Sequence, residues 1–460
     1  MQKNLFYGSL MDMLDSKDPL VVLADTIKWS KFEDEFAQYY SKEGRPAKPI
    51  RLMVGLLLLK QLENLSDENV VIAWKRNPYF QYFCGFSDFQ TALPCHSTDL
   101  VYFRNRIGKK GFEFIFKHSI EIHSNENLNE SQVIADTTIQ ESNLTYPTDG
   151  KLAIKIINHL HKIVKVENIK LRRSYIKEIK QHRINLRFFR HPKKIIKAKA
   201  SMKRLRTIAK TILRDIDRKF GDNLELHNKY ATKFYLYIRV LLQEKNTKNK
   251  IYSLHEIDAY AVNKGKDHKG YEYGTKASVV TTKNSGIIVG VSAHRENEHD
   301  SKTLKLALEN TISNLGSKTI NEVICDRGYR GSKQIIINNE TVIDISIPSN
   351  QQKKDTPEQI NIKKEKFRRR AAIEPIIGHL KSDHRMQRNY LKGFIGDQIN
   401  LLLAATAFNL KKWMNIYFYA FFTGNLFLLK EAYQQLQHQK ELIMFLLQLE
   451  ITMKFSNLDY

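Results

Sequence analysis

Two short stretches decide the fold: Val133-Ile134-Ala135-Asp136 and Val323-Ile324-Cys325-Asp326. Each is an apolar β-type run that ends in an aspartate. Ligand chemistry gathers at the carboxyl ends of strands in an α/β sheet, so adjacent parallel strands would bring Asp136 and Asp326 together. Two close carboxylates repel each other unless a proton or a metal lies between them, and oxygen-only ligands suit Mg²⁺ or Mn²⁺. A lone aspartate at a strand end more often begins a turn, so the metal-site interpretation depends on a third group.

That third group is Glu374, in a helix-prone segment that runs from about Lys363 to Lys412. At about 100° per residue, Phe367, Arg370, Glu374 and Lys381 fall on one stripe of a helix. In a phosphodiester site Glu374 would bind metal, while Arg370 and Lys381 would hold phosphates on either side of the scissile bond. The alternative is a salt-bridged surface face, the usual meaning of Arg and Glu four residues apart.

The charge of the chain favours a polyanionic partner. Its 460 residues carry 74 Lys and Arg against 49 Asp and Glu, a formal net charge of +25. Residues 151–250 hold 29 of these basic residues and 7 of the acidic ones, a net charge of +22, in a segment that should be mostly helical. Phosphates would neutralise such a segment, so we expect it to bind nucleic acid. The residues expected to contact DNA there are Lys193, Lys194, Lys197, Lys199, Arg204 and Arg206.

The first 125 residues resemble a series of short helices separated by turns. Ser97 or Thr98 is expected to cap a short helix that carries Arg104 and Arg106, in the proportions of a helix-turn-helix recognition element. Such helices are also common in all-helical domains without any nucleic-acid partner. We nevertheless assign Arg104 and Arg106 to DNA binding.

Further elements follow from local patterns. We expect a helix over Pro49–Leu62, a helix N-cap at Ser66, strands over Tyr273–Thr282 and Gly286–Val291, and a mobile loop over Asn350–Lys366. The result is an α/β core with a helical insertion between its first strand and the next.

Cysteine usage and hydropathy indicate the compartment. Cys84, Cys95 and Cys325 form no CxxC pair, which argues for a reducing compartment, and the N-terminus does not resemble a secretory signal. The uncharged run Trp413–Leu429 is close to the lower length limit for a membrane span, but a buried C-terminal helix explains the same run without placing a basic protein in a bilayer. We therefore expect a cytoplasmic protein that does not cross a membrane.

The sequence resembles bacterial insertion-sequence transposases of the DDE class, in the IS-five group of the IS-four-like superfamily. That superfamily has a pattern of Tyr, two residues, Arg, three residues, Glu, six residues and Lys, and here Phe367, Arg370, Glu374 and Lys381 occupy those spacings, with Phe in place of Tyr. The other stretches that resemble the group are Gly44–Pro49, Asn77–Cys84, Asp136–Thr138, Tyr146–Asp149, Asp326–Gly331, Ala372–Pro375 and Asn389–Gly393. The similarity extends from about residue 10 to about residue 412.

The resemblance implies an RNase H-like catalytic core in which Asp136, Asp326 and Glu374 form the DDE triad and hold two Mg²⁺ ions, with Mn²⁺ able to substitute. It also implies a helical N-terminal domain, residues 1–125, that helps to bind terminal inverted repeats. The catalytic domain would then cover residues 126–412, with residues 151–250 as its basic helical insertion, and residues 413–460 would be a tail outside the family pattern.

The function implied is cleavage of the element's DNA ends and their joining to target DNA by two-metal-ion phosphoryl transfer. Joining requires two ends to be brought together, so we expect a homodimer in the synaptic complex, associated with the bacterial nucleoid. Two alternatives stay open: a simple RNase H-type metal nuclease, and a catalytically silent relative that only binds DNA.

Overall fold

The computed structural model describes residues 9–418, apart from residues 42, 44–46, 124–127, 190, 245, 264–269, 317–318, 332, 338–340 and 348–354. These residues divide into two compact units, one within residues 1–107, 114–127 and 406–460, the other within residues 108–113 and 128–405. No helix in the described part of the chain is long and apolar enough to cross a membrane, and most of the run Trp413–Leu429 lies outside that part.

The first unit is helical. Its helices, with α7 running on into residues of the second unit, are α1 (Leu10–Met13), α2 (Pro19–Thr26), α3 (Trp29–Ala37), α4 (Ile50–Leu62), α5 (Asp67–Arg76), α6 (Pro78–Phe83) and α7 (Ser97–Glu121). The expected apolar helix α4 is confirmed, and nearly all of its side chains are buried. The predicted N-cap is confirmed as well, because the Ser66 hydroxyl accepts a hydrogen bond from the Asn69 N–H at 3.1 Å.

The prediction for the start of α7 was wrong. The N-cap is His96 rather than Ser97 or Thr98, because the His96 ring accepts from the Thr98 N–H while Asp99 accepts from the His96 N–H. The helix is also long rather than short. It covers 25 residues and is interrupted at Gly108, whose φ of 56° lies in the region that glycine adopts most readily.

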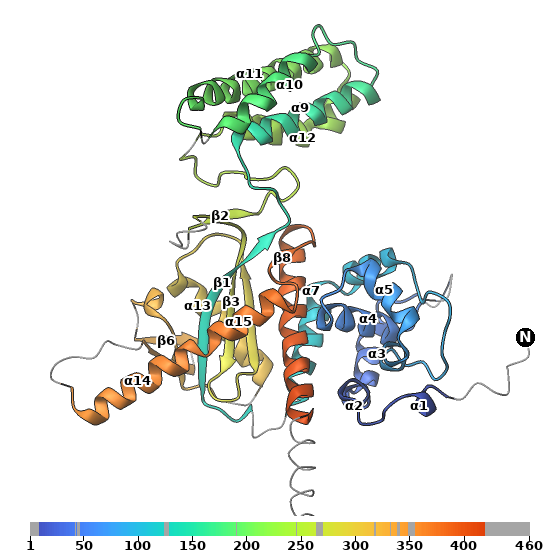
Figure 1. Ribbon diagram of the computed structural model, residues 1–460, viewed down its shortest axis with the longest axis vertical. Coiled ribbons are helices and arrows are strands. Elements are labelled where there is room, and N and C mark those ends of the chain that lie inside the picture. The colour runs from blue at the N-terminus through green and yellow to red at the C-terminus, as the bar shows by residue number, and fades with distance from the viewer. Residues whose placement is uncertain are drawn as a thin grey trace, which may run out of the picture. The chain divides into compact units, whose positions relative to one another are not determined.

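The second unit contains one mixed sheet (Figure 1). Its described strands are β1 (Gln132–Ser142), β2 (Tyr260–Val262), β3 (Glu272–Thr282), β4 (Ile288–His294), β5 (Glu322–Ile324), β6 (Gln334–Ile337), β7 (Thr341–Ser346) and β8 (Arg388–Asn389). The order is β2-β3-β1-β5-β7-β6, with β4 on β3 and β8 on β1. β1 pairs antiparallel with β3 and parallel with β5, and β5 pairs parallel with β7.

The helices that follow the strands in this unit include α13 (Asp300–Leu315), α14 (Pro357–Ala371) and α15 (Ile373–Ser382). α13 packs on β3 and β4, and α15 packs on β1. The loop expected over Asn350–Lys366 is wrong from Pro357 onward, because Thr356 and Gln359 form a capping box that begins α14 there. The expected continuous helix to Lys412 is also interrupted, by β8 and the turns around it, before residues 393–418 become helical again.

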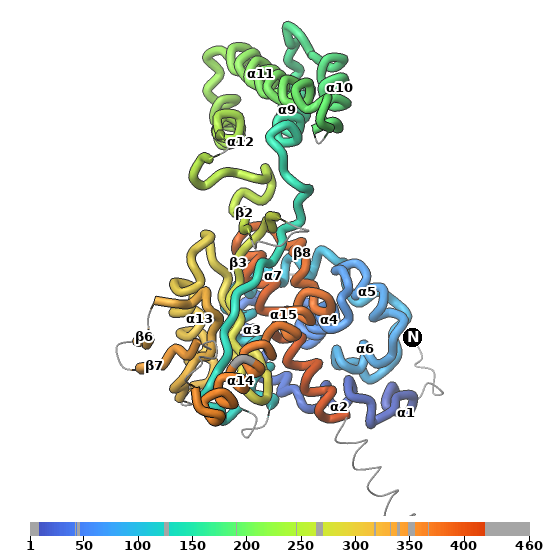
Figure 2. The backbone as a smooth tube through the Cα atoms, turned by 60° about the vertical axis from the view of Figure 1, so that its left-hand side comes forward, coloured from blue at the N-terminus to red at the C-terminus, as the bar shows by residue number. Residues whose placement is uncertain are grey.

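The segment between β1 and β2 forms a helical bundle (Figure 2). It consists of α9 (Asp149–Val166), α10 (Ile176–Asn185), the 3₁₀ turn η1 (Leu186–Phe188), α11 (Ile195–Phe220) and α12 (Leu224–Leu242). α11 packs against α9, α10 and α12 around a core of their apolar side chains. The mostly helical character predicted for residues 151–250 is therefore confirmed.

Candidate active site

The two aspartates that the sequence singles out lie side by side. β1 and β5 are parallel, with Ile134 opposite Ile324, so Asp136 and Asp326 each follow two residues later on neighbouring backbones. Neither is the last residue of its strand, because β5 ends at Ile324, two residues before Asp326. Asp136 lies within β1, which continues to Ser142 because its far half still pairs with β3. The prediction of adjacent parallel strands is confirmed, and the prediction that both strands end at the aspartate is corrected.

Each aspartate has one oxygen held by the backbone. Asp136 Oδ1 accepts from the Thr137 N–H at 2.7 Å, and Asp326 Oδ1 accepts from the Gly328 N–H at 2.8 Å. Asp326 therefore does begin a turn, the 3₁₀ turn η2 (Arg327–Tyr329), and still presents its second oxygen to other groups. A Cβ on Gly328 would lie only 3.0 Å from Asp326 Oδ1, so a larger residue at this position would crowd the carboxylate.

The second oxygens face one guanidinium group. Arg370 Nη2 lies 3.5 Å from Asp136 Oδ2 and 3.7 Å from Asp326 Oδ2, while its Nη1 donates to Glu374 Oε1 at 2.7 Å. Arg370 is in the last turn of α14 and Glu374 in the first turn of α15, on either side of Ala372. Arg370 and Glu374, which the sequence predicts to share one face of a continuous helix, thus lie on two successive helices. They are nevertheless in contact.

An open cleft of about 940 Å³ contains this arrangement. The three carboxylates, Arg370 and Lys381 all line it, so all five residues proposed for catalysis from the sequence share one cleft. Glu374 is the most accessible of the carboxylates, with 58% of its side chain exposed against 34% for Asp326 and 16% for Asp136. The cleft is polar and accessible, as a site for a charged polymer must be.

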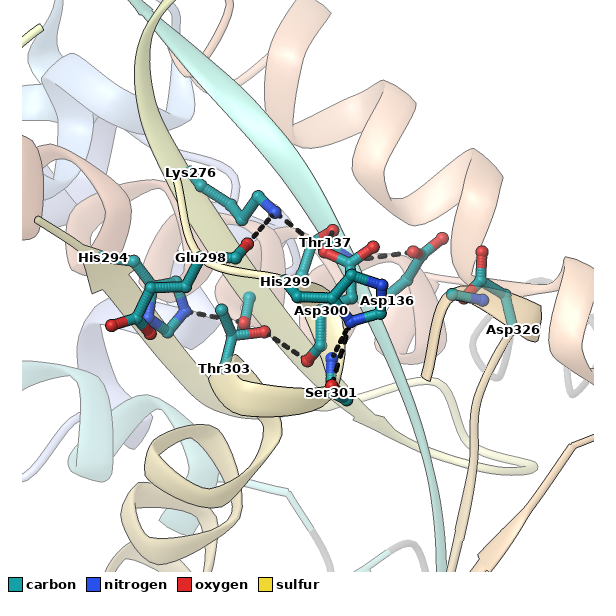
Figure 3. Close-up of polar contacts among 12 residues, drawn as sticks. Asp136, Thr137, Lys276, His294, Glu298, His299, Asp300, Ser301, Thr303 and Asp326 are labelled. Atoms are coloured by element: carbon teal, nitrogen blue, oxygen red, sulfur yellow. Dashed lines mark hydrogen bonds and ion pairs between the residues drawn. The ribbon is translucent and has the colours of Figure 1, made fainter. Parts of the chain in front are cut away.

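The same cleft holds a group that the sequence analysis missed. Lys276 on β3, Thr137 on β1 and Asp300 at the start of α13 converge there, as Figure 3 shows. The Thr137 hydroxyl donates to Asp300 Oδ1 at 2.8 Å, and Lys276 Nζ lies 3.0 Å from the same oxygen. The local sequence around Asp300 suggests only a helix start, with His299 as N-cap. No local pattern could reveal its partners 163 and 24 residues away.

A buried tyrosine lies close to these carboxylates. The Tyr329 side chain is 1% exposed, and its hydroxyl has no hydrogen-bond partner among the residues that the structure describes. Burial, together with the charges of Cys325, Asp136, Asp300 and Asp326, raises the pKa of Tyr329. An orphaned buried hydroxyl next to acidic groups is a place where a further polar or cationic group would be stabilised.

The donor chemistry fits a hard divalent cation. Asp136, Asp326 and Glu374 offer only oxygen atoms, the ligand type that Mg²⁺ and Mn²⁺ prefer. Within the described residues no three acidic, histidine or cysteine side chains are arranged closely enough to hold one ion as they stand. The Arg370 guanidinium lies between the three carboxylates and offsets their mutual repulsion.

Comparison with known proteins finds two transposase domains in the chain. Residues 8–106 match the family model described as "Transposase domain (DUF772)", and residues 246–410 match the one described as "Transposase DDE domain". The chain is 38% identical over 194 residues to "Uncharacterized protein ORF8 in nfe locus" of Rhizobium meliloti, which is 41% of this chain and 94% of that protein. No solved structure matches the chain.

The chain belongs to the DDE transposases of the IS-four-like type. The match to the DDE domain begins at residue 246, after the helical bundle, so it includes Asp326 and Glu374 but not Asp136.

The structure buries one residue that the sequence predicts to contact DNA. Arg104 is 4% exposed, and its Nη1 and Nη2 donate to both carboxylate oxygens of Asp67 at 2.9 and 2.5 Å. Lys60 Nζ lies 2.8 Å from the same carboxylate. This buried ion pair ties α7 to α5 and α4, so Arg104 has a structural role. Arg106 is exposed and lies over the ring of Tyr40, 4.7 Å from its centroid.

The basic residues predicted in the bundle divide into two groups. Lys193, Lys194, Lys197 and Lys199 are exposed around the start of α11. Arg204 pairs with Glu178 at 2.6 Å, and Arg206 donates to the carbonyl oxygens of Leu241 and Gln243 at the end of α12. Arg206 thus helps to hold the bundle together, and the four lysines are the more accessible cations.

Proposed function

We propose that this transposase, a member of the IS-five group, binds the terminal inverted repeats of an insertion sequence, cleaves the DNA strands at its ends and joins them to target DNA. The observation that carries the proposal is the convergence of Asp136, Asp326 and Glu374 on one guanidinium in an open polar cleft. A nuclease that only cuts would need the triad but not the separate basic bundle.

Asp136, Asp326 and Glu374 would hold two Mg²⁺ ions, or Mn²⁺ in their place. Bound there, such ions supply a stronger nucleophile and stabilise the leaving 3′ oxygen. The backbone N–H groups of Thr137 and Gly328 fix one oxygen of each aspartate, so that the other oxygen faces the cleft. Arg370 would then exchange its carboxylate partners for a phosphate oxygen, and Lys381 would bind a second phosphate across the cleft.

The wider architecture belongs to the same proposal. A mixed sheet in which β1 pairs antiparallel with β3 and parallel with β5 supports an RNase H-like core within residues 126–412. Residues 1–125 would form the N-terminal DNA-binding domain and residues 413–460 the tail. We further propose a homodimer in the synaptic complex, in a bacterial cytoplasm and associated with the nucleoid, because two DNA ends must be joined.

The test is cleavage of duplex DNA that carries the element's own ends, with the full-length protein and Mg²⁺. Asp136→Asn and Asp326→Asn should abolish strand cleavage with either Mg²⁺ or Mn²⁺, because each removes a charged ligand. Both variants should still bind the ends in a gel-shift assay. Asp344→Asn is the matched control, since Asp344 is an exposed carboxylate on the neighbouring strand β7.

Normal cleavage by the Asp326→Asn protein would refute the triad. Cleavage by the wild-type protein without joining of pre-cut ends to a target would instead favour a simple metal nuclease.

A further inference from the structure

Asp300 is a carboxylate in the cleft that the proposed triad does not include. Its Oδ1 accepts from the Thr137 hydroxyl at 2.8 Å and lies 3.0 Å from Lys276 Nζ. Its Oδ2 lies 2.9 Å from the position that a Cβ on Gly328 would take, and Asp326 Oδ1 lies 3.0 Å from that same position. The two oxygens are therefore no more than about 6 Å apart, and Asp300 adjoins both aspartates of the triad.

Thr137 links Asp300 to Asp136. The Thr137 N–H donates to Asp136 Oδ1 at 2.7 Å, while the Thr137 hydroxyl donates to Asp300. Thr137 thus contacts both carboxylates, Asp136 through its backbone N–H and Asp300 through its side chain. Because Asp300 belongs to α13 and Thr137 to β1, the start of α13 and the strand are connected at this point (Figure 3).

Lys276 keeps Asp300 in place. Its side chain is 9% exposed, and its Nζ donates to the Glu298 carbonyl at 2.5 Å as well as contacting Asp300. A nearly buried ammonium group requires a charged partner, and Asp300 is that partner. The pair also brings a positive charge to the cleft that contains the carboxylates of the proposed triad, which reduces their repulsion.

We propose that Asp300 is a positioning residue of the transposase site, which acts through Thr137 to orient the Asp136 carboxylate for metal binding. The inference rests on the proposed role of Asp136 as a metal ligand. Groups that orient a metal ligand by hydrogen bonding typically change metal affinity or activity by about 10- to 100-fold when they are removed.

The experiment measures Mn²⁺ binding to the full-length protein by titration calorimetry, without DNA, and compares it with strand cleavage. Thr137→Val, which removes the hydroxyl and keeps the branched shape, should weaken Mn²⁺ binding about tenfold. Thr137→Ser, which restores a hydroxyl, should return the affinity close to that of wild type. Asp300→Asn should weaken binding at least as much as Thr137→Val.

Thr303→Val is the matched control. The Thr303 hydroxyl donates to the backbone carbonyl of Asp300 at 2.8 Å rather than to its carboxylate. This variant removes a hydroxyl from the same turn of α13 and should bind Mn²⁺ as wild type does. Thermal unfolding of each variant verifies that it is folded, and Thr137→Val provides the test if Asp300→Asn does not fold.

Two results separate this inference from the proposed function. If Asp326→Asn abolishes Mn²⁺ binding while folded Thr137→Val binds like wild type, the positioning role of Asp300 is refuted and the triad stands. If Asp326→Asn also binds Mn²⁺ like wild type, the triad itself is refuted.

Discussion

Arg370 and Lys381 lie in the same cleft as Glu374, and Arg370 contacts the carboxylates of the proposed triad there. Arg370 is 24% exposed and contacts all three proposed triad carboxylates, and its Nε is buried without a hydrogen-bond partner in the described part of the chain. Arg370 donates a 2.7 Å hydrogen bond to Glu374, but charge more than hydrogen-bond geometry attracts it to the two aspartates, at 3.5 and 3.7 Å. Such a group can exchange a carboxylate for a phosphate at little cost.

The first prediction concerns these two cations. Lys381→Ala and Arg370→Ala should lower strand transfer from pre-cut ends by roughly one to three orders of magnitude, because removing a charge that stabilises the transition state costs a few kcal/mol. Lys381→Ala should change the free energy of unfolding by less than about 1 kcal/mol. The measurement is transfer of a labelled pre-cut end into plasmid DNA.

Arg368→Ala is the control for this prediction, since Arg368 is an exposed arginine in the same last turn of α14 and does not line the cleft. Wild-type transfer by the Lys381→Ala protein would refute the phosphate-binding role of Lys381.

At the scale of elements, two ion pairs that share Asp67 join three helices of the first unit. Arg104 on α7 and Lys60 on α4 both bind Asp67 at the start of α5. Burial opposes ionisation of Asp67, but the hydrogen bonds and charges of Arg104 and Lys60 outweigh it and lower the pKa of this carboxyl. The arginine that the sequence assigned to DNA is thus part of the helical core.

Arg104→Ala should therefore act on stability rather than on DNA binding. Breaking a buried ion pair costs about 3–5 kcal/mol, and Lys60 remains to offset part of this loss, so we expect a decrease of about 3 kcal/mol in the free energy of unfolding. Arg106→Ala should cost less than about 1 kcal/mol, as exposed substitutions usually do. Urea denaturation followed by fluorescence measures both, and equal effects of the two variants would contradict this assignment.

A second buried carboxylate, Asp397, connects β1, β3 and β8. It accepts from the Thr275 hydroxyl at 2.5 Å and from the Asn389 amide at 2.7 Å. Burial raises the pKa of Asp397 to about 6, although these two hydrogen bonds oppose the shift. Folding therefore stabilises the protonated form of Asp397 relative to the carboxylate.

The stability of the protein should depend on pH for this reason. The pKa of Asp397 is higher in the folded than in the unfolded chain. Its stabilising contribution to the free energy of unfolding is therefore complete below about pH 4 and is lost as the pH rises through 6. At 1.36 kcal/mol per pKa unit the change is roughly 3 kcal/mol. In Asp397→Asn the free energy of unfolding should decrease less between about pH 4.5 and 7 than in wild type. The control Asp222→Asn changes an exposed aspartate and should leave that decrease as it is. The same slope in wild type and Asp397→Asn would contradict the prediction.

The sequence predicts elements well where the signal is local. The apolar runs of β1 and β5, the long helix α11 and the Ser66 cap all follow from short-range patterns. The features that it misses depend on residues distant in sequence. β1 continues past Asp136 because β3 pairs with it, and Arg104 is buried in an ion pair with Asp67, which lies 37 residues earlier. The Thr356 capping box was a local signal that the prediction of a loop overlooked.

For the whole molecule, positive charge is concentrated in one bundle. Residues 151–250 carry a net charge of +22 out of +25, and the lysines at positions 193, 194, 197 and 199 are exposed around the start of α11. Lys194 lies over the ring of Phe188, 4.4 Å from its centroid, whereas Arg204 and Arg206 have polar partners within the bundle. The start of α11 is therefore the part of the bundle most available to a phosphate backbone.

The last prediction tests that surface through its dependence on salt. Each phosphate that the protein neutralises on duplex DNA contributes about 0.9 to the slope of log affinity against log salt concentration. Changing Lys193, Lys194, Lys197 and Lys199 to Glu should therefore flatten the slope by about 0.9 for each phosphate that the variant no longer neutralises. The same charge change at Lys162, Lys165, Lys229 and Lys233, on α9 and α12, should flatten it less, because it alters the net charge without touching the start of α11. Filter binding to end-bearing DNA between about 50 and 200 mM KCl measures both slopes, and an unchanged slope in the first variant would show that the start of α11 does not bind DNA.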